Sequence, residues 1–273
     1  MMPHAGGQYV YLREAFSPLC GFLYGWTLFM VIQTGTIAAV GVGFARYFGI
    51  LWPAVSETSW IVPPIFITKT FAISLSSAQL VGVLVVTFLS LVNMNGVSFG
   101  RGIQNIFTSA KLVALALVIA VGCFIAFNPS VASDNFSNLF HTRTFVPVAP
   151  GVDPTTIFGL LMAMGVAQVG SLFSADAWNN ITFTAGEVRN PGRNVPLSLA
   201  LGTAIVIGLY VLANCAYLMV LPFQGVQNAP SDRVAAAMLQ TAFPSIGGKL
   251  MASIIMVSAF GCINGMVFAG ARA

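Results

Sequence analysis

Charged side chains are scarce in this sequence. Lys and Arg together number 11 and Asp and Glu number 7 among 273 residues, so charged residues are 7% of the chain, against about 25% in an ordinary soluble domain. The apolar share is 57% and includes 22 phenylalanines. So few charges cannot cover a water-facing surface, which excludes a soluble globular enzyme. The aromatic content excludes a disordered chain.

Motifs for metal, redox or nucleotide chemistry are missing as well. The four cysteines stand far apart, with no CxxC and no nearby histidine, and are interpreted as small hydrophobic residues: Cys20, Cys123, Cys215 and Cys262. No GxxxxGK[ST] occurs, so an ATP-driven pump would need another subunit. The net charge is +4, and the basic residues are scattered along the chain without forming a block. This distribution excludes nucleic acid as a partner and favours loops that face an anionic lipid leaflet. No cofactor is expected.

Six long apolar runs account for most of the chain, at about residues 19–48, 78–94, 106–127, 156–185, 197–221 and 247–270. Each run must be helical, because a lone span in lipid has to satisfy its own backbone hydrogen bonds. The sequence therefore predicts an all-α, multi-pass protein of the cell membrane with a single membrane domain. The density of Arg in the short connections predicts that both ends of the chain are cytoplasmic. In one of the long outer loops, Asn135-Phe136-Ser137 matches a glycosylation acceptor, a triplet that is common by chance.

Two ionisable residues fall inside these runs, Lys111 and Asp176, and each costs about 2.5–3.5 kcal/mol to insert. For Lys111 two interpretations stay open. Its side chain either extends to the nearby headgroups, or it faces the helix bundle as a fixed or protonatable cation. An intramembrane hydrolase is not expected, because Asp176 has no carboxylate partner in a span and both histidines lie in loops.

The run that contains Asp176 is unusual in its length and its polar middle. About 30 residues of helix extend about 45 Å, more than the about 30 Å that a bilayer core requires. Ser, Asp and Asn in its centre compete for backbone hydrogen bonds and weaken a helix. One interpretation is a discontinuous helix whose exposed ends bind a charged ligand at mid-membrane. The alternative is a tilted helix whose polar residues join it to other helices.

The first run has a smaller polar notch at residues 33–36, followed by small residues. Close helix packing explains the small residues. Ile32, Thr36 and Val40 fall on one helical face by their spacing, and that face could also line a pocket.

Four segments, in this order, resemble the amino acid–polyamine–organocation (APC) superfamily, and most closely its bacterial amino acid permeases and L-type amino acid transporters. The opening Gly6-Gly7-Gln8-Tyr9-Val10-Tyr11 resembles the re-entrant loop before the family's helix 3, and Thr108 to Lys111 resembles helix 5. Phe173 to Asn180, followed by Asn190-Pro191-x-Arg193-Asn194-x-Pro196, resembles helix 6 and its exit loop. Ser258-x-Phe260-Gly261-x-x-Asn264-Gly265 resembles helix 8.

The resemblance implies a LeuT-like fold with a five-plus-five inverted repeat and roughly twelve helices. This chain would supply the family's helices 3 to 8, with residues 1–18 as a cytoplasmic re-entrant loop and a broken helix near 171–180. It would then be an incomplete portion of its parent protein and would not transport by itself. A structural or assembly subunit without transport activity is the alternative.

The resemblance also assigns roles. Phe173 would be an aromatic gate, Ser174, Asp176 and Asn179 would meet the ammonium of an amino acid substrate, and Ile32, Thr36 and Val40 would line its side-chain pocket. Lys111, together with Ser258, would take the place of a coupling sodium ion. That implies secondary transport of amino acids, by sodium-independent exchange or linked to protons, in a protein whose other partner is membrane lipid. Ala177 departs from the glycine that the family usually has there.

Overall fold

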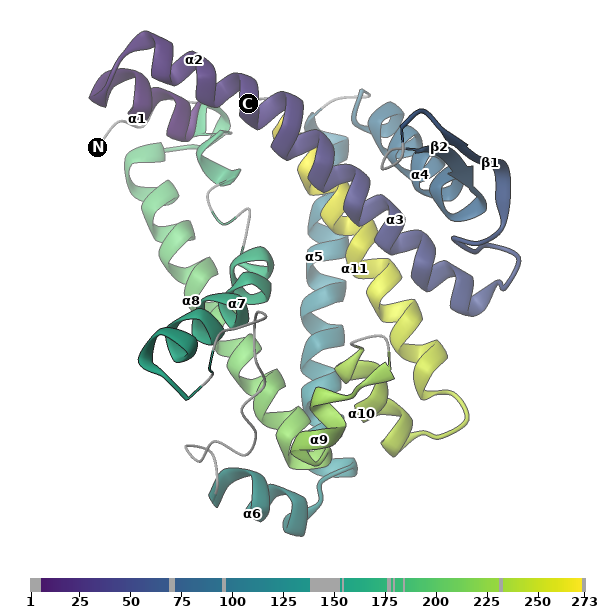
Figure 1. The fold of residues 1–273 in the computed structure, drawn as a ribbon. Coiled ribbons are helices and arrows are strands. Elements are labelled where there is room, and N and C mark those ends of the chain that lie inside the picture. Colours follow the sequence, from purple (N-terminus) through teal and green to yellow (C-terminus); the bar gives the residue numbers. More distant parts are fainter. Residues whose placement is uncertain are drawn as a thin grey trace.

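The computed structural model describes residues 6–68, 72–94, 97–137, 153, 155–175, 178, 180–183, 185–230 and 233–271, with backbone alone at 97–99, 101, 173 and 187. In chain order the elements are α1 (Gly7–Ala15), α2 (Pro18–Thr27), η1 (Leu28–Gln33), α3 (Thr34–Leu51), β1 (Trp60–Phe66), β2 (Ala72–Ser76), α4 (Ser77–Asn93), α5 (Val97–Ala120), η2 (Val121–Ile125), α6 (Pro129–Ser137), α7 (Ile157–Ser174), η3 (Asn180–Thr182), η4 (Ala185–Glu187), α8 (Pro191–Val220), α9 (Phe223–Gln227), α10 (Val234–Ala242) and α11 (Gly247–Gly270) (Figure 1). The helical fold class is confirmed. The antiparallel hairpin β1–β2, in the connection between α3 and α4, is an addition that the sequence did not predict.

A helix occupies each of the six predicted apolar runs. Within the described residues, four helices are long and apolar enough to cross a membrane: Pro18–Leu51, which joins α2, η1 and α3, then Gly102–Ile125, Pro191–Val220 and Gly247–Gly270. Two shorter apolar helices, Ser77–Asn93 and Ile157–Leu172, occupy the remaining runs. The positions at which these helices enter and leave lipid remain predictions.

Helix α11 is the centre of the packed part of the molecule. It contacts α3, α4, α5 and α10, and Figure 1 shows it running between α3 and α5. Toward its C-terminal end, Ile263 and Met266 form a buried cluster with Leu89 of α4. Toward its N-terminal end, Met251 joins a second buried cluster with side chains of α5, α8 and α10. The fold is therefore a set of helices assembled around α11.

Glycines allow the helices of this core to approach closely. A Cβ atom on Gly82 of α4 would lie 3.0 Å from the carbonyl carbon of Gly41 in α3. On α11, a Cβ at Gly261 would lie 2.6 Å from Cβ of Phe107, and one at Gly265 would lie 3.1 Å from the Gln104 amide nitrogen. Small residues four apart are a usual device for packing helices in lipid. A larger residue at Gly82 would push α4 away from α3, and one at Gly261 would push α5 away from α11.

Asn135 caps the end of α8 from the neighbouring helix α6. Its side-chain nitrogen donates to the carbonyls of Leu218 (2.8 Å) and Leu221 (2.9 Å), and its side-chain oxygen accepts from the N–H of Phe223 (3.2 Å). These bonds satisfy carbonyls that a helix end leaves free. Asn135 is only 5% exposed. The buried and hydrogen-bonded amide nitrogen fits the chance explanation of the glycosylation triplet.

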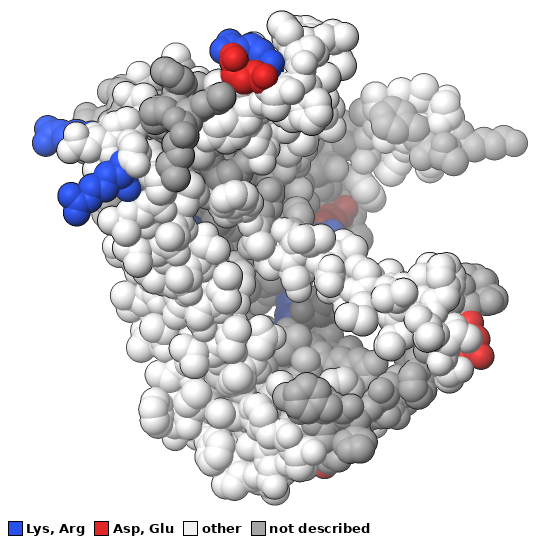
Figure 2. All heavy atoms as spheres, turned by 90° about the vertical axis from the view of Figure 1, so that its left-hand side faces the viewer, with Lys and Arg blue, Asp and Glu red and all other residues white. Residues whose placement is uncertain are grey.

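The basic residues of two connections come together at one end of the molecule. Helix α1, which carries Arg13, contacts η3, and η3 contacts α8, whose start carries Arg193. Figure 2 shows that most of the face formed by α7 and α8 is uncharged and that basic side chains gather mainly toward the end with α1. This arrangement suits the predicted cytoplasmic side, because basic residues concentrate there.

Candidate functional site

Helix α7 ends inside the fourth apolar run. It begins at Ile157, where the Thr156 hydroxyl accepts from the Gly159 N–H (3.1 Å), and ends at Ser174. The sequence predicted an apolar run to about residue 185. Between Ser174 and the start of α8, the only helical elements among the described residues are the short 3₁₀ turns η3 and η4. The Ser174 hydroxyl donates to the Ser171 carbonyl (2.9 Å), a local bond of the kind that weakens continued helix. Helix α7 therefore ends within the segment near residues 171–180 where the sequence predicted a break, and not at residue 185.

The described residues leave part of the predicted substrate site outside. Asp176 and Asn179 lie beyond them, and at Phe173 only the backbone is described. Ser174 is exposed at the end of α7, and Trp178 is also exposed. The roles assigned to Phe173, Ser174, Asp176 and Asn179 stay predictions.

One side chain from another helix reaches the end of α7. The Tyr210 hydroxyl of α8 donates to the Ser174 carbonyl at 3.2 Å. Among the described residues this is the one hydrogen bond between α7 and another helix, and α7 makes only slight contact with the other elements. Sequence reasoning did not single out Tyr210, because nothing local to residue 210 points to a partner 36 residues away.

A polar seam joins α5 to α11 on the other side of the bundle. Gln104, Thr108 and Lys111 share one face of α5 by their spacing. The Lys111 ammonium donates to the Cys262 sulfur of α11 at 3.8 Å, and Ser258 lies one turn from Cys262 on the same face of α11. Lys111 is half-buried and directed at α11, which fits the bundle-facing interpretation better than the extension toward headgroups. Its coupling role stays a prediction.

The seam continues into a cluster of three side-chain amides around Asn264 of α11. Asn264 is fully buried, accepts from the Asn93 amide of α4 (2.9 Å), and donates to the Gln104 side-chain oxygen of α5 (3.1 Å) and the Gly100 carbonyl (3.5 Å). Asn93 also donates to the Leu89 carbonyl (2.8 Å). These bonds tie α4, α5 and α11 together beside the seam. The sequence showed Asn264 only as part of the resemblance to helix 8, and its signal is an amide inside an apolar helix.

The three residues predicted to line a pocket from the first span differ in their surroundings. Ile32 is 42% exposed, and the Thr36 hydroxyl donates back to the Ile32 carbonyl (2.7 Å). Val40 packs against the buried cluster of α4 and α11. Their role with substrate therefore remains a prediction, and Val40 has a packing role in any case.

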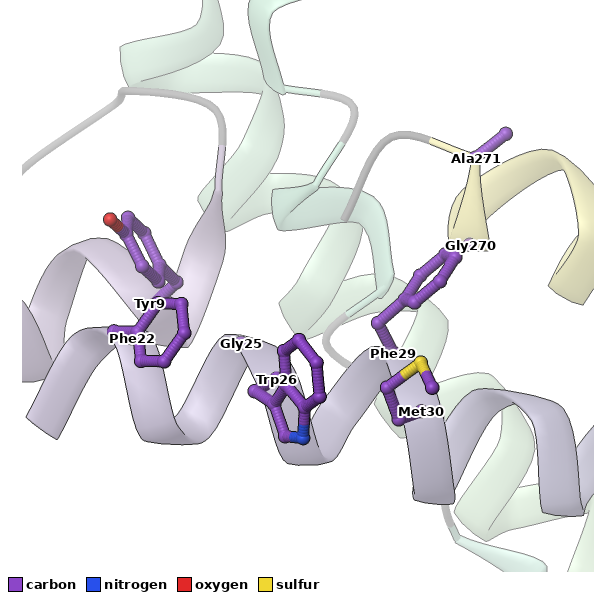
Figure 3. Close-up of a pocket in the computed structure, with 8 residues that line it drawn as sticks. All are labelled: Tyr9, Phe22, Gly25, Trp26, Phe29, Met30, Gly270 and Ala271. Atoms are coloured by element: carbon purple, nitrogen blue, oxygen red, sulfur yellow. The ribbon is translucent and has the colours of Figure 1, made fainter.

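The same span contains a feature that sequence reasoning missed. Residues Leu28–Gln33 form a π-helical turn, η1, in an otherwise α-helical span, and Gln33 at its end is 8% exposed. Such turns are rare and occur often at functional sites. A cavity of about 560 Å³ opens beside it (Figure 3), lined by Tyr9, Phe22, Gly25, Trp26, Phe29, Met30, Gly270 and Ala271. Its lining side chains are apolar apart from the Tyr9 hydroxyl and the Trp26 indole N–H, and none of them is charged, so its chemistry does not suit a zwitterion.

Comparisons with known proteins agree with this helical arrangement. The amino acid permease family model matches residues 1–273. The serine/threonine exchanger SteT of Bacillus subtilis (strain 168) is 29% identical, over 99% of this chain and 52% of that protein. The b(0,+)-type amino acid transporter 1 of Mus musculus is 28% identical, over 100% of this chain and 49% of that protein. The large neutral amino acids transporter small subunit 2 of Oryctolagus cuniculus is 27% identical, over 99% and 45%.

The chain belongs to the amino acid permease family of the APC superfamily, and it is a multi-pass integral membrane protein. It spans about half the length of the relatives that it matches. The family establishes a polytopic, transporter-type helical fold. The structure places Lys111 at the seam between α5 and α11.

Proposed function

We propose that the protein carries amino acids across the membrane by alternating access, and that the C-terminal end of α7 receives the substrate's ammonium group. The observation that carries the proposal is the end of α7 at Ser174, inside an apolar run. Helix C-termini present carbonyls without helical partners and a partial negative charge. In lipid such an end needs a donor, and an ammonium group is a suitable one.

The α5–α11 seam supports a place for coupling in the same account. Lys111 contacts the Cys262 sulfur, and within the described residues no carboxylate forms an ion pair with it. A cation held there occupies the position that the resemblance gives to a coupling sodium ion. We therefore propose transport that does not depend on sodium, either as exchange of one amino acid for another or linked to protons.

Uptake by the full-length protein in proteoliposomes tests this proposal. With a panel of labelled amino acids, we expect saturable uptake of at least one, driven by amino acid inside the vesicles or by a proton gradient, and unchanged when sodium is replaced by choline. Lys111→Ala should abolish or strongly lower uptake, and Lys111→Arg, which keeps the charge, is the matched variant that separates proton exchange from a fixed cation. Absence of uptake of every amino acid under all these gradients would refute the proposal.

The 273-residue chain by itself leaves helix α7 with few packing partners among the described residues. Large apolar side chains of α7, such as Phe158, Leu161 and Leu172, are more than half exposed, so this helix lacks the neighbours that a closed binding site needs. We propose that the chain alone does not transport, in keeping with its span of about half of its relatives. Saturable uptake by vesicles that contain only this chain would contradict that. An assembly role would instead appear as specific association with other membrane subunits and no uptake at all.

A further inference from the structure

The Ser174 carbonyl, at the end of α7, is held by a side chain of α8. The last turn of α7 leaves several carbonyls without helical donors. The Ser171 carbonyl accepts from the Ala175 N–H (3.0 Å) and from the Ser174 hydroxyl (2.9 Å). The Ser174 carbonyl accepts from the Tyr210 hydroxyl (3.2 Å). The acceptor that lies furthest along the helix is thus occupied by a neutral donor from outside α7.

This bond matters because α7 has little else to hold it. Its large apolar side chains are exposed along its whole length, from Ile157 to Leu172, and it contacts the other described elements only slightly. Tyr210, in contrast, is carried by α8, whose far end packs into the buried cluster with Ala216 and Val220. Helix α8 is itself largely exposed before residue 213, so the Tyr210 hydroxyl joins the end of α7 to a helix that is anchored in the core at its far end.

We propose that Tyr210 is a positioning residue that competes with substrate: its hydroxyl holds the Ser174 carbonyl when no amino acid is bound, and the substrate's ammonium group takes that acceptor over. The inference rests on the proposed function, because it needs an ammonium at the end of α7. Binding exchanges one hydrogen bond to the carbonyl for another, with no covalent change. It also releases α7 from α8, so that substrate binding loosens the one polar tie between these helices in the described structure.

The test compares Tyr210→Phe with wild type in the full-length protein, by uptake kinetics and by equilibrium binding of the transported amino acid. Loss of a competing bond should lower both the KM and the dissociation constant about two- to tenfold, because a hydrogen bond of this kind contributes about 0.5–1.5 kcal/mol. The value of kcat should change less than KM. A merely structural role would lower the amount of active protein and kcat while leaving KM and the dissociation constant as they are.

Tyr217→Phe is the matched control. Tyr217 lies two turns further along α8, and its hydroxyl makes no hydrogen bond to the described residues, so its removal should leave both constants unchanged. Tyr210→Leu is a second variant that also removes the hydroxyl and should shift the constants in the same direction. Unchanged or raised constants in both Tyr210 variants, in a protein that transports normally as wild type, would overturn the inference alone. A wild-type protein that takes up no amino acid would overturn the proposed function, and this inference with it.

Discussion

Helices α11 and α7 are both apolar segments of the same chain, but the structure treats them differently. Helix α11 buries residues along its whole length, from Gly247 to Ala269, against four other helices. Among the described residues, helix α7 exposes nearly all of its large side chains and is tied to α8 by one hydrogen bond. In lipid an apolar side chain gains little by leaving the acyl chains for a protein neighbour. Packing and polar bonds, not hydrophobicity, therefore decide which helix is fixed and which can move.

This difference in packing fits two different roles, a scaffold around α11 and a moving element at α7. The α11 assembly, with α3, α4 and α5, is built from close glycine contacts and a set of amide hydrogen bonds between helices, which suits a rigid scaffold. The α7 end has few contacts and one hydrogen bond from another described helix, which suits an element that binds a ligand and changes position. Proteins draw moving, ligand-binding segments from their weakly held parts.

Loss of the amide cluster should give the largest effect on stability. Asn264→Leu keeps the size of a fully buried side chain but leaves the Gln104 oxygen and one hydrogen of the Asn93 amide without partners. We expect a loss of about 3 kcal/mol in the free energy of unfolding, since each unpaired buried group costs about 1–3 kcal/mol. Thermal or denaturant unfolding in detergent measures it.

The matched variant on α7 is Gln168→Leu, at an exposed amide with no hydrogen bond to the described residues, and it should change stability little. In the double variant Asn93→Leu with Asn264→Leu, the loss should be smaller than the sum of the two single losses, because an apolar pair leaves fewer orphans. Equal effects at Asn264 and Gln168 would remove the distinction between the two helices.

A methyl group added to a glycine gives the next largest effect, with opposite sign on the two helices. Gly261→Ala on α11 places a Cβ 2.6 Å from Cβ of Phe107, and the strain should cost about 2 kcal/mol of stability. Gly165→Ala on α7 meets no atom within 4 Å. There the better helix propensity of alanine should leave stability unchanged or raise it by about 0.5–1 kcal/mol. The same unfolding assay measures both variants. A loss of stability in Gly165→Ala would mean that other parts of the protein pack against α7.

The smallest effect should come from the end of α8, which holds Tyr210 in place from the scaffold side. Asn135→Ala removes three hydrogen bonds at that end, but water can replace part of them near the membrane surface, so we expect a loss of about 1 kcal/mol. Mass spectrometry of protein made in a glycosylating host should show no sugar at Asn135. A glycan there would mean that α6 does not dock on α8.

Much of the fold could be predicted from the sequence, because the length and hydrophobicity of a lipid-spanning helix are local properties. The six apolar runs contain helices for that reason, and the serines around residue 174 gave a local signal for the end of α7. The contacts of Asn264 with Asn93, 171 residues earlier, could not be predicted, because no local pattern says which amides meet. The same limit explains Asn135, whose triplet is local while its burial is not, and Val40, whose spacing fitted a pocket as well as the core.

Hydrogen exchange of the backbone amides in the full-length protein, with and without the transported amino acid, tests the central claim most directly. The account predicts that amides of the last turn of α7, around Leu172 to Ala175, exchange quickly in the free protein and more slowly with amino acid bound. Amides around Ile263 in α11 should exchange slowly in both states. Protection that changes in α11 and not at the end of α7 would contradict the account.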